Sequence, residues 1–136
     1  MKNKLCLLLI LSSFVLNIHA QKSIRIGIIG LDTSHSVAFT DLINGDKDNA
    51  FAKGFRIVAA YPYGSKTIES SAKRIPGYIK KVEQQGVEIV SSISELLDKV
   101  DCVLLETNDG RLHLEQAIEV FKSGKTCYID KPIGST

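Results

Sequence analysis

From Ser23 onward, the chain alternates short apolar runs with amphipathic segments, a pattern typical of alternating strands and helices. The apolar runs predict strands at residues 24–30, 55–61, 87–90, 101–106 and 126–129. Helices are predicted at about residues 36–43, 67–74, 78–85, 94–100 and 114–121, with Pro76 and Gly77 separating the second from the third. We find no internal repeat and no long linker in this region.

Two of the predicted helices carry clear end markers. Ser92 and Glu95 form a capping box before SELLDKV, and Gly124 stands where a helix ends. In the last helix Leu114, Ala117, Ile118 and Phe121 form one apolar stripe, which we expect to face a sheet. Strands alternating with helices imply right-handed crossovers, so the predicted fold class is α/β: a doubly wound, Rossmann-like parallel sheet, incomplete, with about five strands.

The first twenty residues differ from the rest. Lys2 and Lys4 precede the apolar run LCLLLILSSFVL. The small residue Ala20 stands directly before the predicted cleavage site, which lies between Ala20 and Gln21. Residues 1–20 are therefore interpreted as a signal peptide, with an uncleaved anchor as the alternative. We expect residues 21–136 to form one Rossmann-like domain, exported to the periplasm or the extracellular space.

Charge and cysteine content narrow the candidate functions. The chain has 17 basic and 15 acidic residues, and removing Lys2 and Lys4 leaves 15 of each. Because the two signs are interspersed, binding to nucleic acid is not expected. Cys102 and Cys127 each lie in a predicted strand, so we expect two buried free thiols rather than a disulfide.

Ligands of such sheets bind beyond the carboxyl ends of the strands, here at GLDTSH, YPYGS, ETNDG and DKP. In the dinucleotide pattern G-x-G-x-x-G, the second glycine lets backbone approach the pyrophosphate and the third lets helix and strand pack closely. Gly30 keeps the first position, but Asp32 and His35 occupy the other two. A carboxylate beside phosphates is repulsive by about 1 kcal/mol even in water, so pyrophosphate binding in the usual pose is expected to be weakened.

Three interpretations of residues 32–35 stay open. Their side-chain oxygens suit a helix N-cap. Thr33 and Ser34 also offer donors to a cofactor phosphate in a shifted position. Thirdly, Asp32 and His35 are candidates for binding another ligand or a metal, although no further ligand cluster is evident in the sequence and no metal site is predicted.

The four loops, in this order, resemble those of the N-terminal nucleotide-binding domain of the Gfo/Idh/MocA oxidoreductases, the family of glucose-fructose oxidoreductase and inositol dehydrogenase. The likeness covers about residues 23–136. Its most specific part is a helix, an xDxVxxxT strand, a histidine entering the next helix, and GKxVxxEKP, for which this chain has SISELLDKVDCVLLETNDGRLHLEQAIEVFKSGKTCYIDKP. Asp130, Lys131 and Pro132 stand for the family's Glu-Lys-Pro.

The resemblance implies NAD- or NADP-dependent oxidation or reduction of a sugar or cyclitol hydroxyl. It places the cofactor pyrophosphate at the first turn and makes Lys131 the catalytic residue at the reacting centre. The cofactor-binding residues implied by position are Gly30, Asp32, Thr33, Ser34, His35, Thr107, Asn108 and His113, with Asp130 and Pro132 flanking the lysine. The loop before His113 is about one residue longer than the family's usual form.

The second strand lacks the acidic residue that binds the adenosine ribose in many such domains. Tyr61 is a candidate for stacking on adenine, and Ser65 with Lys66 for accepting a 2′-phosphate, which favours NADP over NAD. The alternative is that these residues only form a turn.

Family members continue into a second domain that holds the substrate, and we expect this chain alone not to turn over substrate. Three hypotheses follow. The chain is the cofactor domain of an exported oxidoreductase, a non-catalytic ligand-binding module that has lost its dinucleotide, or an interaction protein whose exposed fifth strand docks a partner or a second copy of itself.

Overall fold

A computed structural model describes residues 23–45, 49–50 and 52–134. The predicted signal peptide lies outside these residues. The strands are β1 (Ile24–Ile29), β2 (Phe55–Tyr61), β3 (Glu88–Ile89), β4 (Cys102–Leu105) and β5 (Thr126–Ile129). All five predicted strands are thus present in the described part of the chain, and the bounds of β2 and β5 are those predicted.

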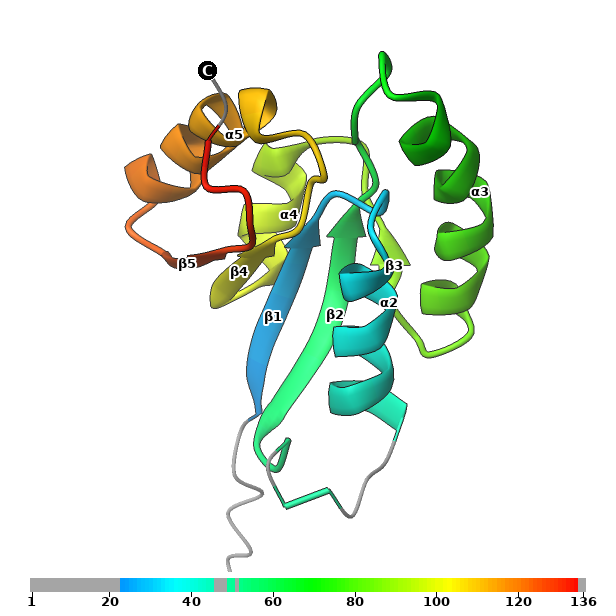
Figure 1. The fold of residues 1–136 in the computed structure, drawn as a ribbon. Helices are drawn as coiled ribbons and strands as arrows, with labels where there is room; N and C mark the ends of the chain where they lie inside the picture. The colour runs from blue at the N-terminus through cyan, green and yellow to red at the C-terminus, as the bar shows by residue number, and fades with distance from the viewer. Residues whose placement is uncertain (1–22, 46–48, 51, 135–136) are drawn as a thin grey trace, which may run out of the picture.

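The strands form one parallel sheet in the order β3-β2-β1-β4-β5. The strand order reverses beside β1, because β2 lies on one side of it and β4 on the other (Figure 1). The predicted α/β class and parallel topology are confirmed. Since all strands run the same way, their carboxyl ends meet along one edge of the sheet, which we call the rim.

Within the described ranges, four α-helices cover the sheet, two on each face. They are α2 (Ser34–Thr40), α3 (Glu69–Glu83), α4 (Ile93–Lys99) and α5 (Gly110–Lys122), and a π-helical segment, η1 (Asp41–Gly45), continues α2. Helices α2 and α3 lie on one face and α4 and α5 on the other (Figure 1). No helix in the described ranges is long and apolar enough to cross a membrane.

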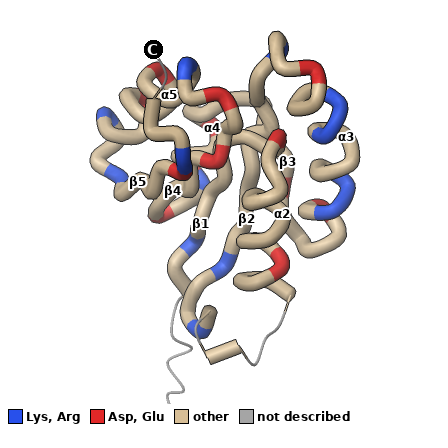
Figure 2. Tube along the Cα trace, in the orientation of Figure 1, with Lys and Arg blue, Asp and Glu red and all other residues tan. Residues whose placement is uncertain are grey.

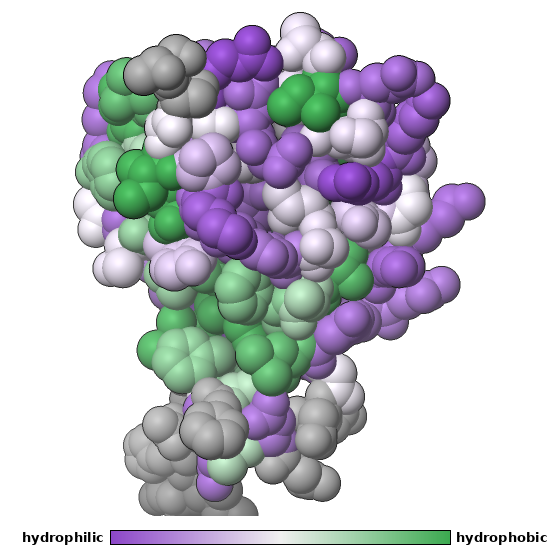
Figure 3. Space-filling model, in the orientation of Figure 1, coloured by the Kyte–Doolittle hydropathy of each residue, from purple (hydrophilic) through white to green (hydrophobic). Residues whose placement is uncertain are grey.

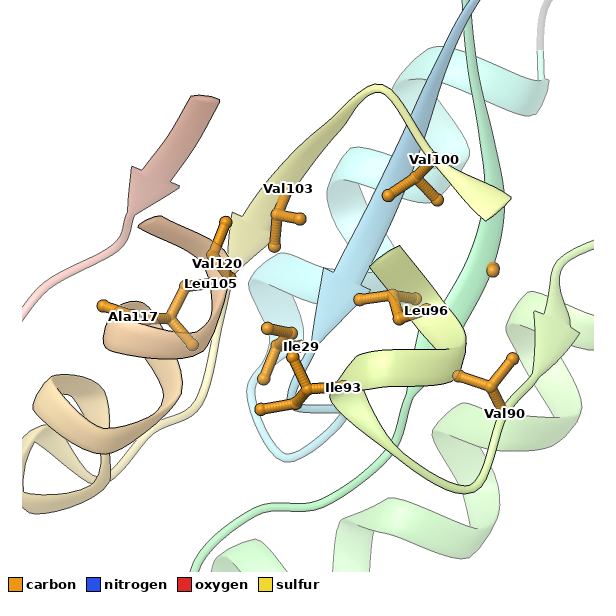
Figure 4. Packing of buried hydrophobic residues seen from close by; sticks show 10 residues of the cluster. Ile29, Val90, Ile93, Leu96, Val100, Val103, Leu105, Ala117 and Val120 are labelled. Atoms are coloured by element: carbon orange, nitrogen blue, oxygen red, sulfur yellow. The ribbon is translucent and has the colours of Figure 1, made fainter. Parts of the chain in front are cut away.

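Each face of the sheet has its own apolar core, because successive side chains of a strand point to opposite faces. Ile29, Val103 and Leu105 pack with residues of α4 and α5, including Leu96 and Val120 (Figure 4). The alternate positions of the strands pack under α2 and α3; this second core contains Ile26, Ile28, Leu31, Val37, Ile57, Ala60, Val82 and Val87. The central strands are therefore apolar on both sides, as the sequence predicts.

Helix α3 runs unbroken through Pro76, so the predicted interruption at Pro76 and Gly77 is wrong. Proline cannot donate the hydrogen bond that would normally go to the carbonyl of Ala72. Both Pro76 and Ala72 are exposed, so water can satisfy that carbonyl. The helix thus tolerates the proline on its solvent side.

The predicted apolar stripe of α5 is also wrong. Leu114 is 73% exposed, and Ile118 and Phe121 are exposed as well. The buried face of the helix is rotated about the helix axis relative to the predicted one. It consists of Gly110, His113, Gln116, Ala117 and Val120. In this orientation Ala117 and Val120 join the apolar core and the ring of His113 reaches the backbone at the end of β4.

The two helix-end markers predicted from the sequence are present in the structure. The Ser92 hydroxyl accepts the backbone N–H of Glu95 at 3.1 Å, although the Glu95 carboxylate accepts from Ser91 rather than from Ser92. Gly124 ends α5 with a φ of 74°, a conformation that favours glycine. Charged residues lie mainly on the helices and loops, and the inner parts of the central strands are free of them (Figure 2).

Cys102 and Cys127 are free thiols, as predicted, but each is only partly buried. Cys127 is in register with Val103, the residue after Cys102, so the two thiols point to opposite faces of the sheet. Their membership of the two different cores agrees with this placement. A bond between them is excluded by the register of β4 and β5.

An apolar patch remains on the face covered by α2, below the rim. Figure 3 shows it in green beneath the polar upper part of the molecule. It surrounds a pocket of about 390 Å³ and comprises Ile26, Phe39, Leu42, Ile43, Ala52, Phe55, Leu104 and Tyr128. The patch lies away from the charged residues at the strand ends.

Candidate functional site

Three loops of the rim enclose one polar pocket of about 470 Å³. Residues after β1, β4 and β5 line it together with one residue of α3. The lining residues are Thr33, Ser34, His35, Arg74, Asn108, Asp130, Lys131 and Pro132. All but Arg74 were predicted as site residues from the sequence, so the fold brings most of that set to one place.

Gly30 allows the loops after β1 and β4 to approach closely. Its φ is 91°, and a Cβ atom at this position would collide with the backbone and hydroxyl of Thr107. Its N–H donates to the carbonyl of Tyr61 at 2.8 Å. The tight turn expected of the first glycine is therefore present.

Asp32 does not line the pocket but points into the protein. Its carboxylate is fully buried and accepts the backbone N–H groups of Ser65 at 3.1 Å and Asn108 at 3.0 Å. The side chain thus ties the first turn to the loops after β2 and β4. The expected repulsion of cofactor phosphates assumed a carboxylate facing them, and the structure corrects that orientation.

The helix cap at the first turn is formed by Thr33. Its hydroxyl accepts the N–H of His35 at 3.1 Å, and its carbonyl accepts the hydroxyl of Ser36 at 2.8 Å. The N-cap interpretation is thus confirmed for Thr33. The side chain of Ser34 is exposed at the pocket wall, where its hydroxyl can face a ligand.

His35 contacts Asp130 across the pocket, from ring Nδ1 to a carboxylate oxygen. Burial acts to raise the pKa of Asp130, but hydrogen bonds from His35 and from the Lys131 backbone outweigh it and lower the pKa. The contact joins the first turn to the Asp130-Lys131-Pro132 turn, which lie 95 residues apart in the chain.

Glu106 lies beneath this contact and was not predicted as a site residue. It is fully buried, and neither of its carboxylate oxygens has a hydrogen-bond partner. Burial and the neighbouring charge of Asp130 raise the pKa of Glu106 to about 7. The buried acid therefore holds its proton more tightly than an exposed glutamate does.

Lys131 extends from the rim into solvent. Its side chain is 76% exposed, and its Nζ lies 4.0 Å from an oxygen of Asp130. The described part of the chain does not bury the amine that the family resemblance makes catalytic. A substrate bound above the pocket would be needed to remove it from water.

The loop after β2 forms a separate part of the rim. Tyr61 stacks on Tyr63 with ring centroids 5.9 Å apart, and burial raises the pKa of Tyr61. A pocket of about 390 Å³ adjoins the two rings. A smaller one of about 190 Å³ contains Lys66, Thr67 and Arg111, whose guanidinium also pairs with Asp109 at 2.7 Å.

Two predicted residues support the rim from below. Thr107 is buried at the end of β4, and its carbonyl oxygen lies 2.6 Å from Nε2 of His113. His113 is itself buried and does not line the polar pocket. A direct role of His113 in cofactor binding stays a prediction, since its contact is with the backbone.

Sequence reasoning missed Arg74 and Glu106. Arg74 lies in the middle of a polar helix, where nothing in the pattern separates it from the neighbouring Lys73. Glu106 directly follows an apolar strand, and only the register places it next to Asp130. Both residues were missed because only the packing of the folded chain brings them to the site.

The residues present suit a phosphate-containing nucleotide. The lining of the pocket includes the hydroxyls of Thr33 and Ser34, the amide of Asn108 and the guanidinium of Arg74. Each of these groups can donate a hydrogen bond to a phosphate oxygen. The Asp130 carboxylate lines the same pocket, so these donors share it with an acid.

Comparison with known proteins agrees with this geometry. Residues 24–136 match the profile of the GFO_IDH_MocA family, described as an oxidoreductase family with an NAD-binding Rossmann fold. No curated protein sequence matches the chain.

Several solved structures share the fold. A dehydrogenase, MviM, from Clostridium difficile is 25% identical with a TM-score of 0.58, and covers 85% of this chain and 32% of its own. The UDP-N-acetylglucosamine 3-dehydrogenase GnnA from Acidithiobacillus ferrooxidans is 18% identical with a TM-score of 0.57, over 82% of this chain and 29% of its own. KijD10, a 3-ketoreductase from Actinomadura kijaniata in complex with TDP-benzene and NADP, is 23% identical with a TM-score of 0.55. The match covers 83% of this chain and 31% of KijD10. The chain spans about a third of the length of these proteins.

Proposed function

Because the chain belongs to the oxidoreductase family with an NAD-binding Rossmann fold, we propose that its polar rim pocket binds the pyrophosphate of a nicotinamide dinucleotide. The observation that carries this proposal is the joining of three loops, distant in sequence, around one pocket with hydroxyl, amide and guanidinium donors. Asp32, which the sequence predicts to oppose phosphate binding, points away from the pocket and holds the loops together.

Arg74 gives this proposal a specific test. Its exposed guanidinium lines the pocket, whereas the adjacent Lys73 pairs with Glu69 and does not. We expect Arg74→Gln to weaken binding of NADH or NADPH about tenfold, as the loss of one charge-assisted hydrogen bond implies. Lys73→Gln is the matched control and is expected to change affinity little. Nicotinamide fluorescence during titration measures both.

Two results of that titration would contradict the proposal. If neither cofactor binds at millimolar concentration, the second hypothesis, a ligand-binding module without a dinucleotide, takes its place. If both variants bind like the wild type, the phosphates lie elsewhere. A circular dichroism spectrum of each variant controls for folding.

We propose NADP as the preferred cofactor. Lys66 and Arg111 flank the small pocket beside the loop after β2, where the adenosine side of a dinucleotide would lie, and the end of β2 has no acidic side chain for a ribose 2′-hydroxyl. Lys66→Gln should then weaken NADPH binding more than NADH binding. Equal losses for the two cofactors would reject the preference.

The proposed activity of the whole protein is oxidation of a sugar or cyclitol hydroxyl, or the reverse. A bound nicotinamide supplies hydride transfer. Oxidation of the hydroxyl also releases one proton, and we assign its transfer to Lys131, whose exposed amine can turn toward a substrate above the pocket. The chain's own contribution is therefore to bind the cofactor and to hold a proton carrier at the rim.

Export is the remaining part of the proposal. The basic start, apolar run and small Ala20 of residues 1–20 support a cleaved signal peptide. Expression in a bacterium followed by mass spectrometry of the periplasmic fraction tests it. A mature chain beginning at Gln21 is expected, and an uncleaved chain in the cytoplasm would contradict export.

A further inference from the structure

Three metal-ligating side chains meet at the rim beneath the polar pocket. His35 comes from α2, Glu106 follows β4, and Asp130 follows β5. Each offers one ligand atom, and these atoms all lie within 4.8 Å of one another. The three residues are called the rim triad below.

The register of the sheet explains why the two acids are adjacent. Leu105 is paired with Ile129, so the next residue of each strand, Glu106 and Asp130, lies at the same level. Leu105 and Ile129 point toward α4 and α5, and the alternation of side chains turns both acids to the opposite face. That face is covered by α2, which brings His35 over them.

Glu106 is the observation that indicates a ligand. His35 and Asp130 satisfy each other by direct contact. The fully buried Glu106 has no hydrogen-bond donor beside either oxygen, and its carboxyl neighbour Asp130 can share a hydrogen bond with it only if one of the two acids holds a proton. Burying a carboxyl group without a hydrogen bond or counter-charge is costly. The side chain of Lys131 extends into solvent, and its Nζ lies 4.0 Å from an oxygen of Asp130.

We propose that the rim triad binds a divalent transition-metal cation, zinc or manganese, with the coordination positions that the triad does not fill open toward the polar pocket. One imidazole nitrogen and two carboxylate oxygens form a donor set that suits these ions. Tetrahedral ligands of zinc stand about 3.4 Å apart, so small side-chain rotations would close the observed cluster around an ion. His35 and Asp130 line the pocket and Glu106 lies below it, which leaves the remaining positions facing the cavity.

A cation here would also change the charge of the cofactor site. Without it, a dinucleotide pyrophosphate approaches Asp130 and Glu106, two acids at the same end of the sheet. A bound divalent ion would offset their charge and is often the largest local charge in such a site. The proposal does not depend on the cofactor, because the triad is complete in the chain itself.

Calorimetric titration of the chelator-treated, untagged 136-residue chain with MnCl₂ and ZnCl₂, without cofactor, tests the site. One-site binding is expected for the wild type, and Glu106→Gln, which keeps the shape of the side chain, should weaken it by about tenfold or more. Glu83→Gln, an exposed acid on α3, is the matched control and should bind like the wild type. Manganese controls for zinc binding to thiols, and CaCl₂, whose ion prefers six to eight oxygen ligands, should bind much more weakly.

A second variant keeps the test decisive if Glu106→Gln does not fold. The side chain of His35 is 42% exposed, so His35→Ala should fold and lose the metal-induced rise in Tm. No heat and no change in Tm at millimolar manganese and zinc would overturn the proposal. Equal metal affinity of the wild type, Glu106→Gln and His35→Ala would overturn it as well. Either result leaves the nicotinamide titration unaffected, so the two proposals fail separately.

Discussion

Gly64 lies directly against the carboxyl group of Asp32, with no room for a methyl group between them. The contact holds the loop after β2 to the first turn, and the same carboxylate accepts the N–H of Ser65. Two positions 32 residues apart thus limit each other's side chains.

We predict that Gly64→Ala destabilises the fold by about 1–3 kcal/mol, the usual effect of overpacking. Gly77→Ala, in the exposed part of α3 with nothing within 4 Å of an added Cβ, is the control and should be neutral or slightly stabilising. Asp32→Ala, which leaves two buried N–H groups unpaired, should be destabilising alone. The double variant Asp32→Ala/Gly64→Ala should lose less free energy of unfolding than the sum of the two single losses, and urea unfolding measures all three. Strict additivity would contradict the contact.

His113 provides a second prediction. Its buried ring contacts the Thr107 carbonyl at 2.6 Å, so His113→Ala removes both packing and a hydrogen bond. We expect a loss of about 2–4 kcal/mol in the free energy of unfolding. Leu114→Ala, on the next residue, should change it by less than about 0.5 kcal/mol because that side chain is exposed. The reverse order would mean that α5 buries its apolar stripe after all.

Acid sensitivity is predicted for Asp109. Hydrogen bonds from the Arg111 side chain, followed by those from the Arg111 backbone and Ser65, outweigh burial and hold the pKa of Asp109 well below its ordinary value. A lowered pKa in the folded state means that the unfolded chain binds more protons, so the stabilisation is present above about pH 4 and is lost as pH falls.

Asp109→Asn isolates this charge, because asparagine can still cap α5. The wild type should be the more stable at pH 7, and the difference should shrink toward pH 3 in urea titrations. A difference that stays constant with pH would show that the carboxylate acts only as a cap.

Replacing Pro76 tests the unbroken helix. Pro76→Ala restores the donor to the Ala72 carbonyl in the middle of α3, and we expect the protein to gain about 2 kcal/mol after the greater entropy of the unfolded chain is subtracted. Lys80→Ala, also exposed on this helix, should be nearly neutral. If Pro76→Ala is destabilising, the ring itself packs usefully against the loop after β2.

The sheet was predictable because its signals are local. The apolar run of β1 and the alternation of strands with helices fix a parallel sheet, and that topology alone gathers Thr33, Asn108 and Lys131 at one edge. Gly30 was recognisable since its turn needs a residue without a Cβ. These features depend on few residues close together in sequence.

What the sequence did not reveal depends on contacts between distant residues. The Asp32 carboxylate points to N–H groups of two other loops, and the buried face of α5 places His113 against a carbonyl at the end of β4. Hydropathy ranks Leu114 above His113 as a core residue, but a hydrogen bond available only in the fold reverses the order. Glu106 likewise follows from strand register, which periodicity does not specify.

The opposite placement of Cys102 and Cys127 has a consequence for where this domain can fold. No thiol partner lies within reach of either among the described residues, and burial raises the pKa of both, that of Cys127 to about 11, so neither is a ready nucleophile near neutral pH. Oxidising conditions therefore have no bond to make between them, and reducing conditions have none to break. Among the described residues, the fold therefore does not depend on a disulfide.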